Sequence, residues 1–344
     1  MTQPLEDRQP EAPDSEEYVA AESARRTRNR RIFRAAVLVV AGVLLMWAVF
    51  LEAPGEIARW YRAAALESAV AARQGDDESG DYSTAIERVT RAIEWDPSNP
   101  NFFLQRSDWY LDTEQYEKAL EDIETVIEFA PNHAAGYSQR IIVNRKLERF
   151  QEVAEDCDKI VELTEDRGFM EHQQALNGRA YLKAQGNLDL EEGLADSEQA
   201  VTMLRELEAS PQKMAGLQID PIRLDLLLSQ TLDTRAYVRH LLVKQAFDAG
   251  DGETGALLFD QALSDYNEAI RRINRVREKL RLLSLKGELQ VNQTALERLR
   301  EEVVHCSVIH QHRGELYALR GWQRFADADF QRAKAMGYDP KYGW

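Results

Sequence analysis

Hydrophobic positions recur at steps of three and four residues along most of the chain, which predicts amphipathic helices. The pattern is clearest in a first predicted helix over Pro100–Leu111 and a second over Tyr116–Phe129. Polar residues 112–115 form the predicted turn between them, and Pro131 prevents the second helix from continuing. No stretch of useful length alternates as a half-buried strand would, so we expect an all-α fold.

The same pattern returns along the chain with a period of about 34 residues. The columns that match at this period are Tyr82, Tyr116 and Phe150; Ala85, Ala119 and Val153; Val89, Ile123 and Cys157; and Ala92, Val126 and Ile160. Agreement of several columns at one period is hard to obtain by chance and indicates an internal repeat.

This repeat resembles the helix-turn-helix unit of the tetratricopeptide repeat (TPR) family, which has the same length. The resemblance is most regular over residues 66–167 and implies a right-handed solenoid of about six repeats. Looser repeats are predicted over 168–285, where Gly178 and Gly193 take the small packing positions and an insertion containing GDGETG splits one unit. A helical spacer over 286–305 and a terminal repeat over 306–344 complete the predicted TPR domain, 66–344.

An uncharged apolar run over residues 35–51 stands apart from the repeats. As a helix it would measure about 26 Å, at the short end for crossing a bilayer. Six arginines within residues 23–34 precede it, so the positive-inside rule predicts a cytoplasmic N-terminus. We therefore predict a disordered tail with an Arg-rich flank over 1–34, a transmembrane helix over 35–51 and a helical neck over 52–65.

A cleaved signal peptide or a buried soluble helix would be alternative interpretations of this run. The predicted layout resembles membrane-anchored bacterial TPR proteins, which implies a scaffold or accessory factor of an envelope complex. The repeats would then lie on the extracytoplasmic side of the inner membrane.

The net charge of −16 falls on the part of the chain after the apolar run, because residues 1–34 sum to zero. An acidic domain is a poor binder of polyanions, so we expect no nucleic-acid partner. The segment RRINRVREKLR, Arg271–Arg281, reverses this trend with six bases and one acid. It predicts either a contact with an acidic partner or a helix face that pairs with the acidic repeats.

His305, Cys306, His310 and His312 form the one cluster with metal-like spacing, since Cys306 and His310 share a helix face. A metal-binding enzyme subunit is therefore an alternative function, although structural histidines are the simpler interpretation. The sequence contains no P-loop, GxGxxG, HExxH or GxSxG motif. We predict no catalytic residue, cofactor or metal, and a buried, inert thiol at Cys157.

In the TPR family, the first helices of successive repeats line a concave groove that takes peptide segments or helices of other proteins. Aligning the repeats predicts nine groove residues, in three sets: Asp108, Leu111 and Asp112; Ile142, Arg145 and Lys146; and Arg179, Leu182 and Lys183. The groove would be acidic at one end and basic further along. Residues 270–305 carry an apolar stripe that predicts packing within the array or self-association into a homo-oligomer.

Overall fold

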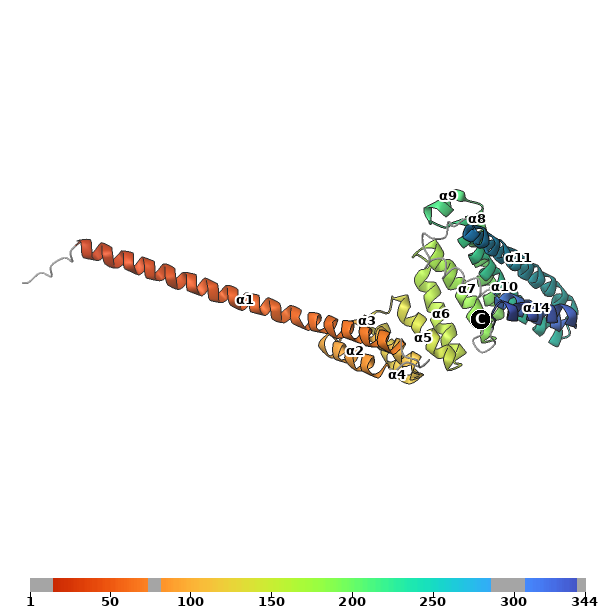
Figure 1. Cartoon of the computed structure of the whole chain (residues 1–344), viewed down its shortest axis with the longest axis horizontal. Coiled ribbons are helices and arrows are strands. Elements are labelled where there is room, and N and C mark those ends of the chain that lie inside the picture. The colour runs from red at the N-terminus through yellow and green to blue at the C-terminus, as the bar shows by residue number, and fades with distance from the viewer. Residues whose placement is uncertain (1–14, 74–81, 286–306, 339–344) are drawn as a thin grey trace, which may run out of the picture. The chain divides into compact units, whose positions relative to one another are not determined.

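The computed structural model describes residues 15–73, 82–285 and 307–338 (Figure 1). Within the first helix it leaves out the side chains of residues 15–24, 27, 29, 31–32, 35–36 and 44–52. Every secondary-structure element of the described residues is a helix, which confirms the all-α prediction for them. The chain divides into two compact units, Met1–Phe102 and Phe103–Trp344.

The first unit contains α1 (Ser15–Arg73) and α2 (Ser83–Trp95). One continuous helix thus replaces the predicted tail after residue 14, the apolar run, the neck and the first helix of repeat 1. The prediction of disorder over 15–34 is wrong in the structure, because this segment is rich in Glu, Ala and Arg, which favour helix. Residues 1–14 of the predicted tail and the loop 74–81 lie outside the described residues.

Helix α2 packs against the C-terminal part of α1 through small side chains. Ala65 of α1 and Ala85 and Ala92 of α2 have no exposed surface. Arg88 of α2 donates to the carbonyl oxygen of Ala64, at 2.8 Å, and to Oγ of Ser68, at 2.7 Å. These contacts make α1 and α2 the first helix pair of the array.

The described side chains of the apolar run are exposed, with Val37 at 50%, Leu38 at 72% and Val39 at 65%. Among the described residues, no helix contains a stretch that is long and apolar enough to be identified as a membrane span. The side chains of residues 35–36 and 44–51, which belong to the predicted transmembrane helix, lie outside the described residues.

The regular repeats are α3 (Pro100–Asp112) with α4 (Tyr116–Phe129), and α5 (Ala134–Lys146) with α6 (Phe150–Thr164). Both helices of the second pair begin one repeat period after their counterparts, which confirms the predicted period. The turns repeat as well, since Glu114 and Glu148 both have a φ of 57°. The boundary between the two units falls within α3.

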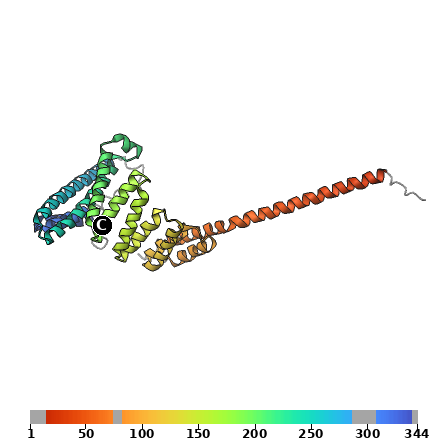
Figure 2. The same cartoon turned by 180° about the vertical axis from the view of Figure 1, so that it is seen from behind.

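The second unit continues with further helices, most of which pack in succession (Figures 1 and 2). They are α7 (Phe169–Gln185), α8 (Leu190–Glu208), the short α9 (Pro211–Gly216), α10 (Pro221–Asp248), α11 (Gly252–Leu285), α13 (Ser307–Leu319) and α14 (Gln323–Ala335). The described residues thus form six TPR-like helix pairs, with α9 outside the pairing. The predicted spacer falls within residues 286–306, which lie outside the described residues.

The predicted insertion within the fifth repeat is not a loop. Helix α10 extends the first helix of that repeat to Asp248 and α11 starts at Gly252, so the extra residues lengthen both helices. Residues 205–222, within the predicted looser repeats, contain the end of α8, all of α9 and the start of α10.

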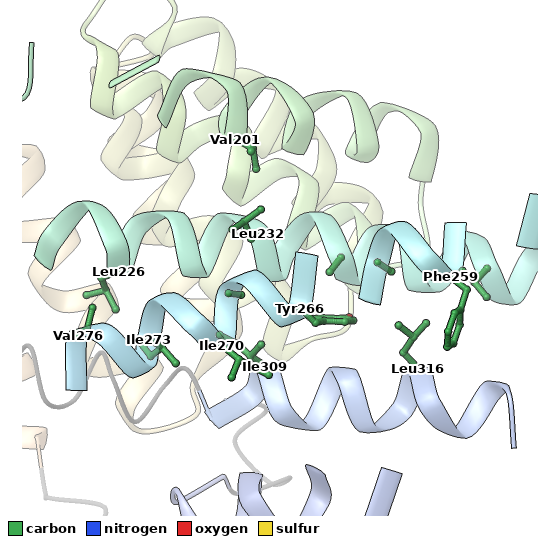
Figure 3. Close-up of a cluster of buried hydrophobic side chains, with 14 residues drawn as sticks. Val201, Leu226, Leu232, Phe259, Tyr266, Ile270, Ile273, Val276, Ile309 and Leu316 are labelled. Carbon is green, nitrogen blue, oxygen red and sulfur yellow. The ribbon is translucent and has the colours of Figure 1, made fainter. Parts of the chain in front are cut away.

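An extensive apolar core among the described residues joins α10, α11 and α13 and includes Val201 of α8 (Figure 3). Ile270, Ile273 and Val276 of α11 are 9%, 1% and 0% exposed within it. The described part of the stripe predicted for self-association therefore packs inside the chain. Its continuation over 286–305 lies outside the described residues.

Histidine and tyrosine side chains lie beside this core, where α10 packs against α13. His312 stacks on Tyr237 with ring centroids 4.4 Å apart, and its Nδ1 lies 3.2 Å from Oδ1 of Asp233. Burial opposes the charged form of His312, but the charge of Asp233 and its hydrogen bond outweigh burial and raise the pKa of this histidine. Burial, aided by the charges of His312 and Lys244, lowers the pKa of His240 to about 4.

Acid should destabilise the protein through His240, whose Nδ1 has no hydrogen-bond partner. The unfolded chain protonates this ring near pH 6.5 but the folded chain only near pH 4, so stability present above pH 6.5 is lost as the pH falls towards 4. The loss is up to about 3 kcal/mol. In the variant His240→Leu, urea unfolding between pH 7.5 and 4 should show a shallower fall in stability. Parallel pH profiles would contradict the assignment.

Candidate protein-binding site

One ion pair recurs in five of the helix pairs of the second unit. In each, an arginine of the first helix donates from Nε and Nη2 to the two carboxylate oxygens of an aspartate on the second helix, at distances of 2.6–2.9 Å. The pairs are Arg106–Asp122, Arg140–Asp156, Arg179–Asp196, Arg235–Asp265 and Arg313–Asp329. The five aspartates are only 1–6% exposed, so the pairs hold the two helices of each repeat together.

These pairs were not predicted, although the sequence carries a signal for them. Arg106 and Arg140 are one repeat period apart, as are Asp122 and Asp156. An arginine that returns at the repeat period together with an aspartate predicts a partner within the repeat. Both carboxylate oxygens are engaged, so these residues fix helix packing and offer little to a ligand.

The Arg–Asp pairs also set the register of α7. Arg179 takes the position of Arg140, whereas the alignment of the repeats predicts the position of Ile142 for it. The small packing position of α7 is Ala180, which has no exposed surface, and a Cβ on Gly193 of α8 would lie 3.5 Å from its carbonyl oxygen. The prediction that Gly178 packs there is wrong, because a Cβ at Gly178 would have no neighbour within 4 Å.

The predicted groove residues of α3 and α5 are partly exposed. Asp108 accepts a hydrogen bond from Nε2 of Gln139 on α5, which links two successive first helices. Ile142 is 43% exposed. Of the remaining predicted groove residues on these two helices, Leu111 and Arg145 are half-buried, and Asp112 and Lys146 are exposed.

The predicted basic residues of α7 are neutralised by acids. Nη1 of Arg179 lies 3.1 Å from Asp158 and 3.3 Å from Glu192, in addition to its pairing with Asp196. Lys183 is 5% exposed and its ammonium group lies 3.1 Å from Asp158. An acidic ligand would have to displace these carboxylates, so this end of the groove is not the free basic surface that the sequence suggested.

An apolar cavity of about 320 Å³ opens between α5, α6 and α7. Four apolar residues, Ile141, Cys157, Ile160 and Leu182, form part of its wall. Gly178 lines it without a side chain, and its polar residues are Thr164, Glu171, Gln174 and Arg179. The cavity therefore includes two of the nine predicted groove residues, Arg179 and Leu182, and its surface suits an apolar side chain.

The thiol of Cys157 adds apolar surface and no reactivity. It is 4% exposed, as predicted, and burial, with the nearby charges of Asp156 and Asp158, raises its pKa to about 12. It stays protonated at neutral pH, and a protonated thiol is a poor nucleophile.

The described histidines of the predicted metal cluster point to different carboxylates. Nδ1 of His310 lies 3.0 Å from Asp329 on α14, and His312 contacts Asp233 on α10. Across the described ranges, no three His, Cys, Asp or Glu residues are placed to hold a metal ion. His305 and Cys306 lie outside those ranges.

Three of the six bases in the segment Arg271–Arg281 pair with the chain's own acids in the described structure. Arg272 is 4% exposed and donates to Glu208 and Asp225, both at 2.9 Å. Arg275 donates to Asp225, and Arg281 to Glu278. These contacts favour the second interpretation, a helix face that pairs with the acidic repeats.

No family model and no curated protein matches the sequence. Among solved structures, MamA 41-end from Desulfovibrio magneticus RS-1 is 14% identical, with 62% of this chain and 97% of that chain covered and a TM-score of 0.40. A tetratricopeptide repeat protein from Parabacteroides merdae is 16% identical, with 82% and 96% covered and a TM-score of 0.36.

Aspartyl phosphate phosphatase F from Bacillus subtilis is 12% identical, with 88% of this chain and 76% of that chain covered and a TM-score of 0.46. Identities and TM-scores this low support no conclusion about activity or partners. The assignment of a TPR-like array therefore rests on the repeat period and on the Arg–Asp pairs within this chain.

Proposed function

We propose that this protein is a membrane-anchored TPR-like scaffold that binds a segment of another protein and performs no catalysis itself. The observation that carries the binding proposal is the open apolar cavity between α5, α6 and α7. The one arginine that lines this cavity among the described residues, Arg179, is already paired with Asp196 and offers little to a polar ligand.

The cavity suits one apolar side chain of a partner, presented by a peptide or a helix. Filling it would bury apolar surface on Ile160 and Leu182, and full burial of an aliphatic or aromatic side chain is worth about 1.5–3 kcal/mol. Glu171 and Gln174 lie at the same cavity and can accept or donate hydrogen bonds to the partner's backbone.

Photo-crosslinking in intact cells tests this site. A photoreactive amino acid in place of the exposed Gln174 should yield a defined adduct with one partner. The matched control is the same replacement at Gln199, an exposed glutamine of α8 that does not line the cavity. Equal adducts from both positions, or none from Gln174, would contradict the proposed site.

The membrane proposal rests on the uncharged run over residues 35–51 and the six arginines before it. The described side chains of that run are exposed on a helix that offers them no packing partner, as with Leu38 and Val40 at 72% and 57%. A bilayer would cover this surface, with the arginines on the cytoplasmic side. The array would then act on the extracytoplasmic side of the inner membrane, as part of an envelope complex.

Two lysines in the run should release the protein from the membrane. Each lysine at the centre of a span costs about 2.5–3.5 kcal/mol, so the full chain with Val39→Lys and Val40→Lys should leave the membrane pellet after an alkaline wash. The control Val70→Lys, at a 54% exposed position of α1 outside the run, should stay in the pellet. A C-terminal reporter that is active only outside the cytoplasm should be active in the wild type; an expressed but silent fusion would refute the orientation.

A further inference from the structure

A second cavity, of about 490 Å³, lies where α11, α13 and α14 meet, and it shares no lining residue with the cavity over α5–α7. It shares Ile270 with the core in Figure 3. Each of the three helices contributes one arginine to its wall: Arg277 from α11, Arg313 from α13 and Arg332 from α14. Basic groups from three separate helices thus converge in a chain that is strongly acidic.

The carboxylate of Asp329 does not balance these three guanidinium groups. Arg313 takes both of its oxygens, and His310 also contacts it at 3.0 Å. Arg332 reaches the same carboxylate only at 3.3 Å, and its side chain is 60% exposed. Arg277 donates to the sulfur of Met336 over 3.9 Å, and a thioether is a weak acceptor. Among the described residues, the cavity therefore keeps an excess of positive charge with Asp329 ionised.

Asp329 does remain ionised at neutral pH. Burial favours its protonated form, but hydrogen bonds from His310 and Arg313 outweigh burial and hold the pKa of this carboxyl well below its usual range. Its single negative charge is shared among Arg313, His310 and Arg332, so Arg277 and Arg332 retain capacity for further acceptors.

Comparison with the regular repeat of α5 and α6 explains why a cavity exists here. Matching the Arg–Asp pairs places His310 where that repeat has the buried Tyr137, and Ala335 where it has Glu162. Glu162 pairs with Lys159 at 2.8 Å, and Lys159 corresponds to Arg332. The terminal repeat thus has a smaller ring and lacks the carboxylate that would neutralise Arg332.

Helix α11 forms one wall of the cavity because it is longer than the second helices of the regular repeats. Helix α4 ends at Phe129, shortly after its paired Asp122, whereas α11 continues far beyond its paired Asp265, to Leu285. Asn274 and Arg277 belong to this extension and line the cavity. Helix α4 ends before the positions that match Asn274 and Arg277, so it does not form the equivalent wall beside α5.

We propose that this cavity binds an acidic peptide segment, with carboxylates of the ligand held by Arg277 and Arg332. Guanidinium groups bind carboxylates through two parallel hydrogen bonds, and the amide of Asn274 can bind the peptide backbone. The volume lies within the range of roughly 300–1,000 Å³ that is typical of ligand sites, and a single small anion would leave most of it empty.

Fluorescence anisotropy of the full-length chain in non-ionic detergent tests the proposal. The probe is a labelled hexapeptide of alternating glutamate and serine, and its matched control carries glutamine in place of glutamate. The glutamate peptide should bind saturably, with an affinity that falls as salt is added, and the glutamine peptide should not bind. Arg277→Gln and Arg332→Gln should each weaken binding at least about tenfold, because each removes charged hydrogen bonds.

Two further variants separate this site from a general effect of charge. Ala335→Glu restores the carboxylate of the regular repeat, should pair with Arg332 three residues earlier, and should weaken binding. Arg281→Gln removes a base of the same helix that is 65% exposed and pairs with Glu278, and it should leave binding unchanged. All four positions are exposed, so the fold should survive each replacement.

Equal affinity for the two peptides, the same affinity in both arginine variants as in the wild type, or no saturable binding would overturn the proposal. Inorganic phosphate serves as a separate probe. If phosphate binds and the glutamate peptide does not, the cavity is a site for a small anion and the acidic-peptide proposal fails.

Discussion

The variant Arg140→Met should lose about 3–5 kcal/mol of stability, because it leaves the carboxylate of Asp156 buried without its counter-charge. Asp156 is 2% exposed and receives its charged hydrogen bonds from Nε and Nη2 of Arg140, at 2.9 and 2.6 Å. Chemical denaturation of the full-length chain in non-ionic detergent measures the loss.

The double variant Arg140→Met with Asp156→Leu should recover most of that stability. Replacing both members of a buried ion pair by apolar side chains removes the cost of desolvating the charges along with their attraction. The control Lys159→Met breaks the pair with Glu162, whose side chain is 67% exposed, and should cost less than about 1 kcal/mol. A loss for Arg140→Met no larger than that of the control would show that the pair does not stabilise the repeat.

The regular repeats could be predicted closely because their hydrophobic pattern, turn residues and proline all predict the same helix boundaries. The predicted helix Tyr116–Phe129 has the bounds of α4. The long helices α10 and α11 could not be delimited, because a TPR alignment treats residues beyond the standard length as an insertion. Residues 224–229 of α10 are all buried, so this helix lacks the one-sided polarity that marks a helix in sequence.

The binding site was predicted less well than the fold. Groove residues were assigned by the spacing of small residues, and α7 has two candidates, Gly178 and Ala180. Only the contact of Ala180 with Gly193 and the pairing of Arg179 with Asp196 decide between them. Likewise, the charge of Lys183 is visible in the sequence, but its neutralisation by Asp158 depends on the packing of α7 on α6.

The variant Gly178→Leu should strongly weaken partner binding without destabilising the protein, and this combination separates a binding role from a structural one. A Cβ at position 178 meets nothing within 4 Å, so a leucine side chain can extend into the cavity over α5–α7. Glycine within a helix costs about 1 kcal/mol relative to good helix formers, so the variant should be at least as stable as the wild type.

By occupying the cavity, the leucine would exclude an apolar anchor worth about 1.5–3 kcal/mol, which weakens partner binding by roughly 10- to 100-fold. The readout is the yield of the adduct from the photoreactive residue at position 174, with unfolding measured in parallel. Gly178→Ala is the matched control: it gives the same gain in helix propensity but adds a single methyl group, so the adduct should persist. An undiminished adduct in Gly178→Leu would place the partner elsewhere on the array. A loss of the adduct in both variants would point to the flexibility of α7 rather than to the volume of the cavity.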